Sequence, residues 1–306
     1  MTRLAWRGNS LLCLASLILA SLPVWASPYT MQLASSALIA AMFALSLQML
    51  TGAAGLVSLA HAAFFGLGAY TVYGLGSVSV AVSLPAAMVT AGLAAAIIGP
   101  LALRTRGFYF LMTTLAFGQM LFFLFHDTPL GGGADGVFIA RPDLFWPVPK
   151  AARPQVFLLL NLAMLSLMYA GLWWLTGTLF GRALTGIRIN ENRMRALGHD
   201  IQRLKWLAFV LAGALAGLAG HMAALTDAFV SPESLGWHRS AEALLMILLG
   251  GLNALHGPIL GAFALTAVRD LGQIVTERQH LVEGITILAA VLFLRRGLAG
   301  LLTSGR

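Results

Sequence analysis

The amino-acid sequence predicts an all-α integral membrane protein, a polytopic bundle of about ten transmembrane helices. Of its 306 residues 59% are hydrophobic and 10% are charged, and the mean hydropathy is +0.85, whereas a soluble domain carries roughly 25% charged residues. The apolar residues form continuous runs, and about 20 helical residues cross a hydrocarbon layer about 30 Å thick. Helices are favoured over a barrel because the runs do not alternate and a helix pairs its backbone polar groups internally.

The spans can be assigned in chain order from these runs. Seven clear apolar runs cover residues 11–26, 32–50, 56–75, 80–103, 108–126, 155–176 and 205–226. Runs at 241–254, 258–275 and 281–294 are shorter or are interrupted by glycine and proline. We interpret them as three further crossings. A re-entrant segment near 250–258 is the competing interpretation and reduces the total to eight, so the range is eight to ten.

The first run has a second interpretation. Residues 1–26 imitate a cleavable signal peptide, with Arg3 and Arg7 ahead of an apolar stretch and Val24-Trp25-Ala26 before Ser27. The same pattern serves as a retained first helix with its positive end in the cytoplasm, which is the interpretation adopted here. Cys13, the single cysteine, has no partner in the sequence for an intrachain disulfide.

The basic residues are distributed unevenly between the two sides of the membrane. With the N-terminus inside, the inner side receives 13 of the 19 Lys and Arg residues. These are Arg3, Arg7, Arg104, Arg106, Arg182, Arg188, Arg193, Arg195, Arg203, Lys205, Arg295, Arg296 and Arg306. The bias follows the positive-inside rule and predicts cytoplasmic N- and C-termini. The net charge of +8 is therefore a topology signal, and we expect membrane lipid and no nucleic acid as partner.

Two loops stand out within the single transmembrane domain 1–306. The outer, periplasmic loop 127–153 contains three consecutive glycines and four prolines and is expected to form an ordered or semi-ordered cap. The inner, cytoplasmic loop 177–204 is basic, and any cytoplasmic partner must dock there. Within it, residues 187–197 predict a short helix that ends at Gly198 in a left-handed cap. An ordinary basic linker at the membrane surface is the alternative.

The motifs of enzymes are missing from the sequence. Lys150 and Lys205 are the only lysines, and neither follows a phosphate-binding glycine loop. There is no His-Glu-x-x-His or Gly-x-Ser-x-Gly motif. We therefore predict that the chain is not an enzyme, with no catalytic or metal-binding residues and no bound cofactor. Acidic residues lie at span ends apart from Asp270, which disfavours an ion-coupled carrier.

Several segments in collinear order resemble a known family. The run Gly55 to Thr71, the run Arg106 to Gln119 and the inner loop with Glu191 and Gly198 are similar to permeases of branched-chain amino acid ABC importers, especially the LivM-type subunit. Pro232-Glu233-Ser234 and the run 249–262 fit the same template. The resemblance spans about residues 35–300.

The resemblance implies an assembly in the bacterial inner membrane. This chain would form half of a translocation pathway with a LivH-like second permease. Two ABC ATPase subunits would bind ATP and Mg, and a periplasmic solute-binding protein would deliver the solute. Branched-chain amino acids are the expected solutes, with urea, short amides or other amino acids as alternatives. An ion-coupled secondary transporter, a membrane enzyme and a structural scaffold are the rival classes.

The resemblance also implies where the functional residues lie. The inner loop would be the ATPase-coupling loop, with Arg182, Arg188, Glu191, Arg195, Ala196 and Gly198 as its candidate residues. Polar and small residues inside the spans are candidates for lining the pathway or for packing helices together, and the sequence leaves both roles open. They are His61, Gly66, Gly68, Tyr70 and Gln119.

Overall fold

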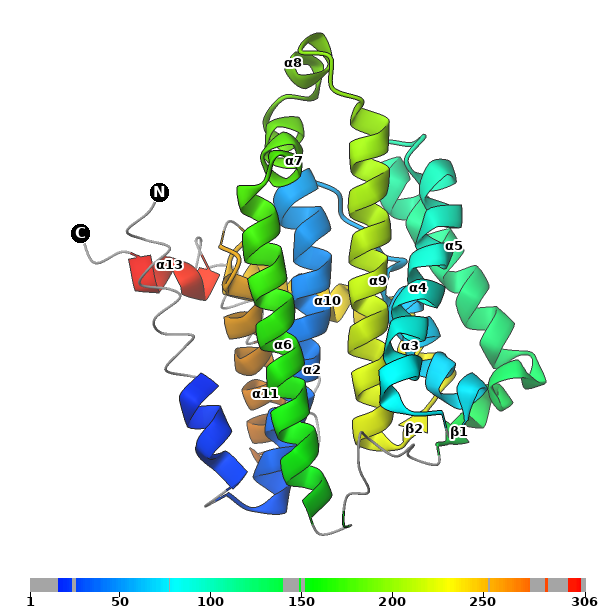
Figure 1. The fold of residues 1–306 in the computed structure, drawn as a ribbon, viewed down its shortest axis with the longest axis vertical. Coiled ribbons are helices and arrows are strands. Elements are labelled where there is room, and N and C mark those ends of the chain that lie inside the picture. The colour runs from blue at the N-terminus through cyan, green and yellow to red at the C-terminus, as the bar shows by residue number, and fades with distance from the viewer. Residues whose placement is uncertain are drawn as a thin grey trace. The chain divides into compact units, whose positions relative to one another are not determined.

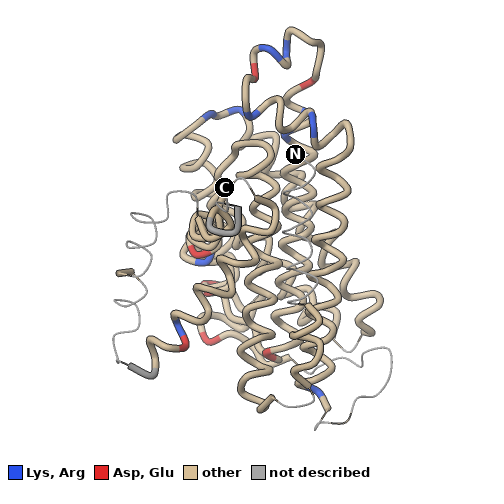
Figure 2. The backbone as a smooth tube through the Cα atoms, turned by 90° about the vertical axis from the view of Figure 1, so that its left-hand side faces the viewer, with Lys and Arg blue, Asp and Glu red and all other residues tan. Residues whose placement is uncertain are grey.

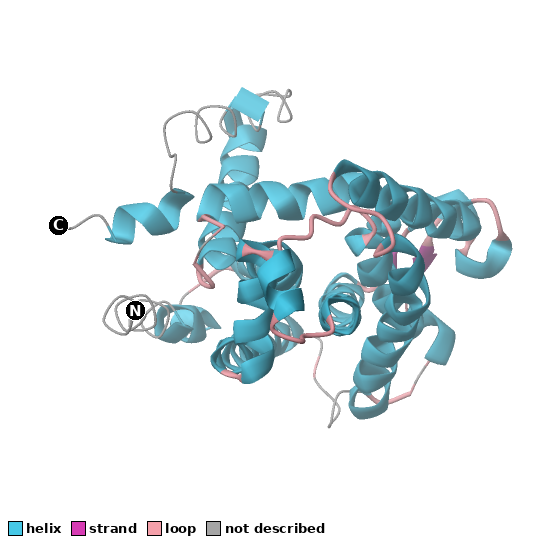
Figure 3. Cartoon of the chain, turned by 90° about the horizontal axis from the view of Figure 1, so that it is seen from above, coloured by secondary structure: helices cyan, strands magenta, loops and turns pink. Residues whose placement is uncertain are grey.

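The computed structural model describes residues 16–23, 26–76, 78–139, 149, 152–252, 254–275, 284–285 and 297–303. Helices make up most of this part of the chain (Figure 3). In chain order the elements are α2 (Pro28–Gln48), the π-helix η1 (Met49–Ala54), α3 (His61–Leu75), α4 (Val80–Ala102), α5 (Phe108–His126), the 3-10 turns η2 (Pro129–Gly131) and η3 (Gly133–Asp135), β1 (Val137–Phe138), α6 (Arg153–Gly177), α7 (Leu179–Ile189), α8 (Glu191–Ala196), α9 (Ile201–Asp227), β2 (Phe229–Val230), the 3-10 helix η5 (Pro232–Leu235), α10 (Trp237–Gly250), α11 (Gly257–Val275) and α13 (Gly297–Thr303) (Figure 1). Residues 16–23 are also helical.

The chain forms two units. Unit 1 contains residues 1–45, 150–167 and 243–306, and unit 2 contains residues 46–149 and 168–242.

Five helices are long and apolar enough to cross a membrane. They are Pro28–Ala54, Val80–Ala102, Phe108–His126, Arg153–Gly177 and Ile201–Asp227. The all-α membrane class is therefore confirmed, whereas the count of ten crossings is not. The predicted run 281–294, apart from residues 284–285, and residues 11–15 and 24–25 of the first run lie outside the described residues.

The predicted span 56–75 is wrong at its beginning. Helix α3 starts only at His61, since η1 ends at Ala54 and residues 55–60 are not helical. Gly55 has φ +71°, in the left-handed region where a side chain is disfavoured, so glycine is the residue that suits this exit from the helix. The run from α2 to α3 is therefore interrupted within an apolar sequence.

Helix α9 is the centre of unit 2 and packs against α3 and α4. Glycines allow these helices to approach closely. A Cβ added to Gly68 of α3 would lie 2.5 Å from the Cα of Gly217 on α9. A Cβ added to Gly213 would lie 2.6 Å from the Cβ of Ala95 on α4. Since lipid is as apolar as leucine, such close packing stabilises membrane helices where the hydrophobic effect cannot.

Two short strands form a ladder that the sequence analysis did not predict. Strand β1 follows η3, and β2 lies between α9 and η5. Strand β1 pairs antiparallel with β2, with Val137 opposite Val230 and Phe138 opposite Phe229. The predicted ordered cap therefore has ordered turns and a strand in residues 127–139. Most of residues 140–151 lie outside the described part.

In unit 1, the end of α10 lies against the beginning of α11. A Cβ added to Gly257 would lie 3.1 Å from the carbonyl carbon of Gly250. The predicted span 241–254 is wrong in its extent, because the helix ends at Gly250 and α11 begins at Gly257. In the same unit, the Tyr29 hydroxyl on α2 donates a hydrogen bond to Asp270 on α11. Asp270, the acidic residue that the sequence placed away from the span ends, thus accepts a hydrogen bond from a tyrosine.

Candidate functional site

The α7–α8 segment, residues 177–204, consists of two short helices with a break at Asn190. Asn190 has extended backbone angles, φ −157° and ψ 98°, and its side chain accepts from the Arg193 N–H at 3.0 Å. The predicted single helix 187–197 is therefore wrong, because asparagine is a favoured N-cap and starts a new helix at Glu191. Gly198 has φ +85° and ends α8 in the predicted left-handed conformation.

Glu191 is the centre of an ion-pair cluster that joins three parts of unit 2. Its carboxylate lies 2.8 Å from the Lys205 Nζ on α9, 3.1 Å from the Arg195 Nη2 on α8 and 3.7 Å from the Arg106 Nη2 in the α4–α5 connection. The Lys205 side chain is 14% exposed and that of Glu191 is 27% exposed. The hydrogen bond from Lys205 is the main cause that lowers the pKa of Glu191 below its usual value, and the neighbouring charges add to it.

Arg188 connects α7 to the π-helix. Its guanidinium donates to the carbonyl of Gly52. A Cβ added to Gly55 would lie 3.2 Å from the Arg188 Cγ. Leu184 and Ile187 are buried on the same helix. The α7–α8 segment is thus connected both to η1 through Arg188 and to α9 through Glu191.

The tip of the α7–α8 segment carries exposed apolar and basic side chains. Ile189 is 80% exposed and Leu197 is 67% exposed. Arg182, Arg193 and Arg195 are exposed on the same segment. Most of the Lys and Arg positions in the described part of unit 2 lie at the end where α7 and α8 lie, with Arg239 on α10 as an exception (Figure 2). Ala196 and Gly198 are also exposed.

The structure thus unites only some of the predicted coupling residues. It brings Glu191 and Arg195 together, while Arg188 contacts η1 and the Arg182 Nε donates to the carbonyl of Thr178 at 3.4 Å. The sequence analysis missed Lys205 and Arg106 as functional candidates. It counted both as topology signals and Arg106 also as the first residue of a motif run, but it assigned neither a role in coupling. A spacing of 14 residues between Glu191 and Lys205 matches no local helical spacing that would reveal the pair.

The interruption before α3 is held by side chains from α5 and α10. Thr114 accepts from the Leu59 N–H at 3.2 Å. The Ser240 Oγ donates to the Leu59 carbonyl at 2.9 Å and accepts from the Ala62 N–H at 2.8 Å. Non-helical backbone at membrane depth needs such partners, because lipid supplies none. His61 is buried beside it and shares a 2.7 Å hydrogen bond with Ser46.

The other pathway candidates lie in packed positions. A Cβ on Gly66 would meet the Leu235 Cδ1 at 2.8 Å. The Tyr70 hydroxyl donates to the Gly131 carbonyl at 3.3 Å, and its ring stacks on Phe125 with centroids 4.5 Å apart. Gln119 buries its Nε2 without a hydrogen-bond partner among the described residues.

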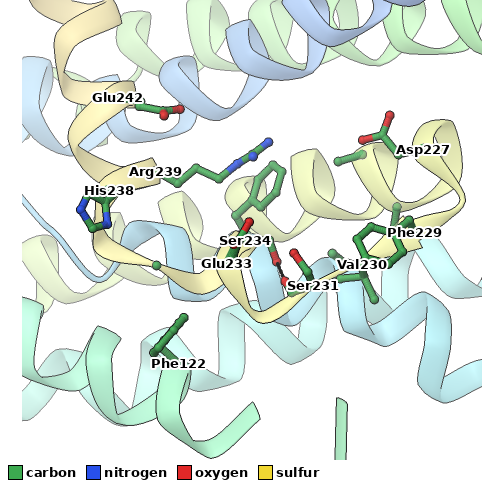
Figure 4. A pocket seen from close by; sticks show the side chains of 15 residues that line it. Phe122, Asp227, Phe229, Val230, Ser231, Glu233, Ser234, His238, Arg239 and Glu242 are labelled. Carbon is green, nitrogen blue, oxygen red and sulfur yellow. Dashed lines mark hydrogen bonds between the residues drawn. The ribbon is translucent and has the colours of Figure 1, made fainter. Parts of the chain in front are cut away.

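A pocket of about 460 Å³ lies between α3, α5, the end of α9, η5 and the beginning of α10, all within unit 2. Arg239 extends from α10 into it, and its guanidinium carbon lies 4.5 Å from the centroid of the Phe65 ring. Figure 4 shows Arg239 among the side chains of Asp227, Glu233 and Glu242. Of these four charged residues the sequence analysis had noticed only Glu233, as part of a motif, because they come from three separate elements.

Comparison with known proteins adds independent evidence. The family model described as branched-chain amino acid transport system / permease component matches residues 29–292. The high-affinity branched-chain amino acid transport system permease protein LivM of Escherichia coli is 31% identical over 95% of this chain and 75% of its own length. Its Salmonella typhimurium counterpart is 30% identical with the same coverage. The autoinducer 2 import system permease protein LsrC of Klebsiella pneumoniae is 37% identical over 34% of this chain and 32% of its own. No solved structure matches the chain.

Proposed function

The chain belongs to the family of permease components of branched-chain amino acid transport systems, and on this premise we propose that it is one permease subunit of an ATP-driven importer for branched-chain amino acids. It forms half of the translocation pathway with a second, LivH-like permease. Two ABC ATPase subunits bind ATP and Mg, and a periplasmic binding protein delivers the solute. The chain itself forms part of the membrane pathway, and the ATPase subunits hydrolyse ATP.

The α7–α8 segment is the observation that carries this proposal. Exposed apolar side chains beside cations are typical of a docking surface, and Ile189 and Leu197 stand out at its tip. The segment is connected to the helices behind it by Glu191 with Lys205 and by Arg188 with Gly52. Closure of the docked ATPases would therefore move η1 and α9 together with the segment, as a rigid-body displacement.

The proposed topology follows from this docking surface. The α7–α8 segment and both termini lie in the cytoplasm, and residues 127–139 with the β1–β2 ladder lie on the periplasmic side of the bacterial inner membrane. The excess of Lys and Arg at one end of unit 2 supports this orientation through the positive-inside rule (Figure 2).

Accessibility labelling tests the orientation. In a background with Cys13→Ser, single cysteines are placed at Leu197 and at Phe138, which is 86% exposed on β1. In intact cells an impermeant thiol reagent should label Phe138→Cys and leave Leu197→Cys unlabelled until the cells are opened. Labelling of Leu197→Cys in intact cells would overturn the proposal.

Cross-linking and reconstitution test the partners and the solute. Leu197→Cys or Ile189→Cys should cross-link to a cysteine on the ATPase in the assembled importer, whereas Phe138→Cys should not. The reconstituted importer should hydrolyse ATP faster when its binding protein is loaded with leucine, isoleucine or valine. Stimulation by urea or a short amide alone would redirect the solute assignment while leaving the subunit's role intact.

A further inference from the structure

We propose that the pocket around Arg239 is a solute site that binds a free amino acid in its zwitterionic form as it passes through this subunit. Arg239 receives the carboxylate, the acidic side chains around it receive the ammonium group, and the aromatic wall receives an aliphatic side chain. This inference rests on the proposed function and adds a place and a recognition chemistry to it.

The size and composition of the pocket suit a small amphipathic solute. Ligand sites have volumes of roughly 300–1,000 Å³ with mostly apolar walls and a few polar groups, and this pocket measures about 460 Å³. Phe65, Phe122 and Val230 line it together with small alanines of α3 and α9. An aliphatic side chain can bury its apolar surface there, while its charged head meets the polar residues.

Arg239 has the chemistry and the setting of a carboxylate receptor. It is half-buried, and its guanidinium carbon lies over the Phe65 ring, 4.5 Å from the ring centroid. A guanidinium binds a carboxylate through the parallel N–H groups at its edge. The phenyl ring covers one side of the guanidinium and leaves the other sides to a carboxylate.

The acidic side chains of the pocket suit an ammonium group. Asp227 ends α9, Glu233 lies in η5 and Glu242 lies on α10, so the carboxylates stand on different walls (Figure 4). In the described part of the chain, no group of three or more His, Cys, Asp and Glu side chains could hold a metal ion. Spread carboxylates fit the charge of an organic ammonium better than a bare cation that needs several close oxygen ligands.

The balance of charge predicts selectivity as well as binding. One guanidinium faces three carboxylates in the pocket, so its field is negative overall. A neutral zwitterion can place its ammonium group against this field, but a second carboxylate on the solute is repelled. The pocket should therefore discriminate against aspartate and glutamate.

The pocket also contacts the interrupted helix. Arg239 is followed on α10 by Ser240, which binds the backbone of Leu59 and Ala62 at the start of α3. Phe65, whose ring lies under the Arg239 guanidinium, is in the first turns of the same helix α3. A solute that moves Arg239 therefore acts on the non-helical residues 55–60 and the start of α3 through both Ser240 and Phe65.

The test uses the complete importer in lipid nanodiscs without the binding protein, because the binding protein has a solute site of its own. Binding of leucine is measured by saturation-transfer difference NMR, which detects weak ligands. Arg239→Gln should weaken leucine binding at least about tenfold, the scale of a lost charge-assisted hydrogen-bond pair. Arg239→Lys should fall between Arg239→Gln and wild type, because lysine keeps the charge but not the planar fork. Arg153→Gln, an arginine outside the pocket, is the matched control and should bind as wild type does.

Leucine methyl ester separates the two halves of the recognition, because it keeps the ammonium group and has no carboxylate. It should bind wild type more weakly than leucine does, and Arg239→Gln should not weaken its binding. Conversely, Asp227→Asn with Glu242→Gln should weaken both ligands and admit glutamate as a competitor, whereas Asp135→Asn should change neither. Equal binding of leucine and its methyl ester to wild type would overturn the role of Arg239.

Import measurements distinguish failure of this inference from failure of the proposed function. Uptake into proteoliposomes is driven with a saturating, leucine-loaded binding protein, and basal ATP hydrolysis reports assembly. If wild type imports leucine and assembled Arg239→Gln binds and imports it equally well, the pocket inference is overturned and the importer assignment stands. If wild type imports no amino acid, the proposed function itself is overturned.

Discussion

Lys205 on α9 donates a hydrogen bond of 2.8 Å to Glu191 on α8, across 14 positions of sequence. Both side chains are largely shielded from solvent. This pair is the direct side-chain link between the α7–α8 segment and the longest buried helix of unit 2. A displacement of α8 by a docked partner therefore reaches α9 without passing through the turn at Gly198.

Replacing Glu191 should uncouple the importer. Glu191→Gln removes the partner of Lys205, a loss of about 1 kcal/mol for a partly shielded pair, or about fivefold in an equilibrium. ATP hydrolysis stimulated by the loaded binding protein should fall by at least that factor, while the complex still assembles by size-exclusion chromatography. Asp200→Asn, which breaks an exposed ion pair with Arg203 and keeps a capping side chain, should remain coupled. Normal stimulation of Glu191→Gln would count against the coupling role.

The same pair should make the segment sensitive to acid at unusually low pH. The hydrogen bond from Lys205 lowers the pKa of Glu191 in the folded protein. Its stabilisation is therefore complete above the ordinary carboxyl pKa of about 4.3 and is lost as pH falls through the lower folded value. The protection factors of residues 190–198 against hydrogen exchange, which correct for the pH dependence of the intrinsic rate, should be high at pH 5 and fall below pH 4. Glu191→Gln should show less protection than wild type at pH 5, match wild type once Glu191 is protonated, and lack this transition.

Gly198 should be required because its backbone adopts a left-handed conformation, and not because a larger side chain would clash with a neighbour. An added Cβ would have no neighbour within 4 Å, but φ is +85°. Gly198→Ala should therefore cost about 1–2 kcal/mol of left-handed strain and reduce stimulated ATP hydrolysis with assembly intact. Gly177→Ala, at a helical glycine with equally open surroundings, should behave as wild type. Equal activities for the two variants would refute a role for the turn.

Ser240 should stabilise the interruption before α3. Ser240→Ala leaves the Ala62 N–H and the Leu59 carbonyl without this partner, at a cost of about 1–3 kcal/mol for buried groups. The melting temperature of the detergent-solubilised protein should fall. In Ser166→Ala the lost hydroxyl donates only locally, to the Leu162 carbonyl one turn back, so little change is expected. A melting temperature of Ser240→Ala equal to that of Ser166→Ala would contradict the assignment.

Two glycines on one helix provide a matched test of the α3–α9 crossing. Gly68→Ala places a methyl group 2.5 Å from the Gly217 Cα, which forces the helices apart and should destabilise the protein by about 1–3 kcal/mol. Gly74→Ala meets nothing within 4 Å and should be neutral or stabilising by up to about 1 kcal/mol. Thermal unfolding and yield from membranes measure both. A Gly68→Ala protein as stable as Gly74→Ala would disprove the close crossing.

Several features of the fold could be predicted because they are recorded locally. The runs 80–103 and 108–126 correspond to α4 and α5 with boundaries within one residue. Their hydropathy, and the arginines and glycine that flank them, can be seen in the local sequence alone. The left-handed turn at Gly198 was predictable for the same reason. The break at Asn190 was missed although asparagine is a good cap, because the amphipathic pattern around it was read as continuous.

The sequence by itself determined the membrane-embedded helical class and the family, because the length and hydropathy of a run decide whether a helix suits lipid, and because motifs in collinear order identify relatives. Only the tertiary structure decided which charges meet, where α3 begins and which side chains surround the pocket. Glu191 and Lys205, Ser240 and Leu59, and Arg239 and Phe65 lie in separate elements. Their proximity depends on how helices pack after the chain has turned back, and no short-range pattern encodes that distance.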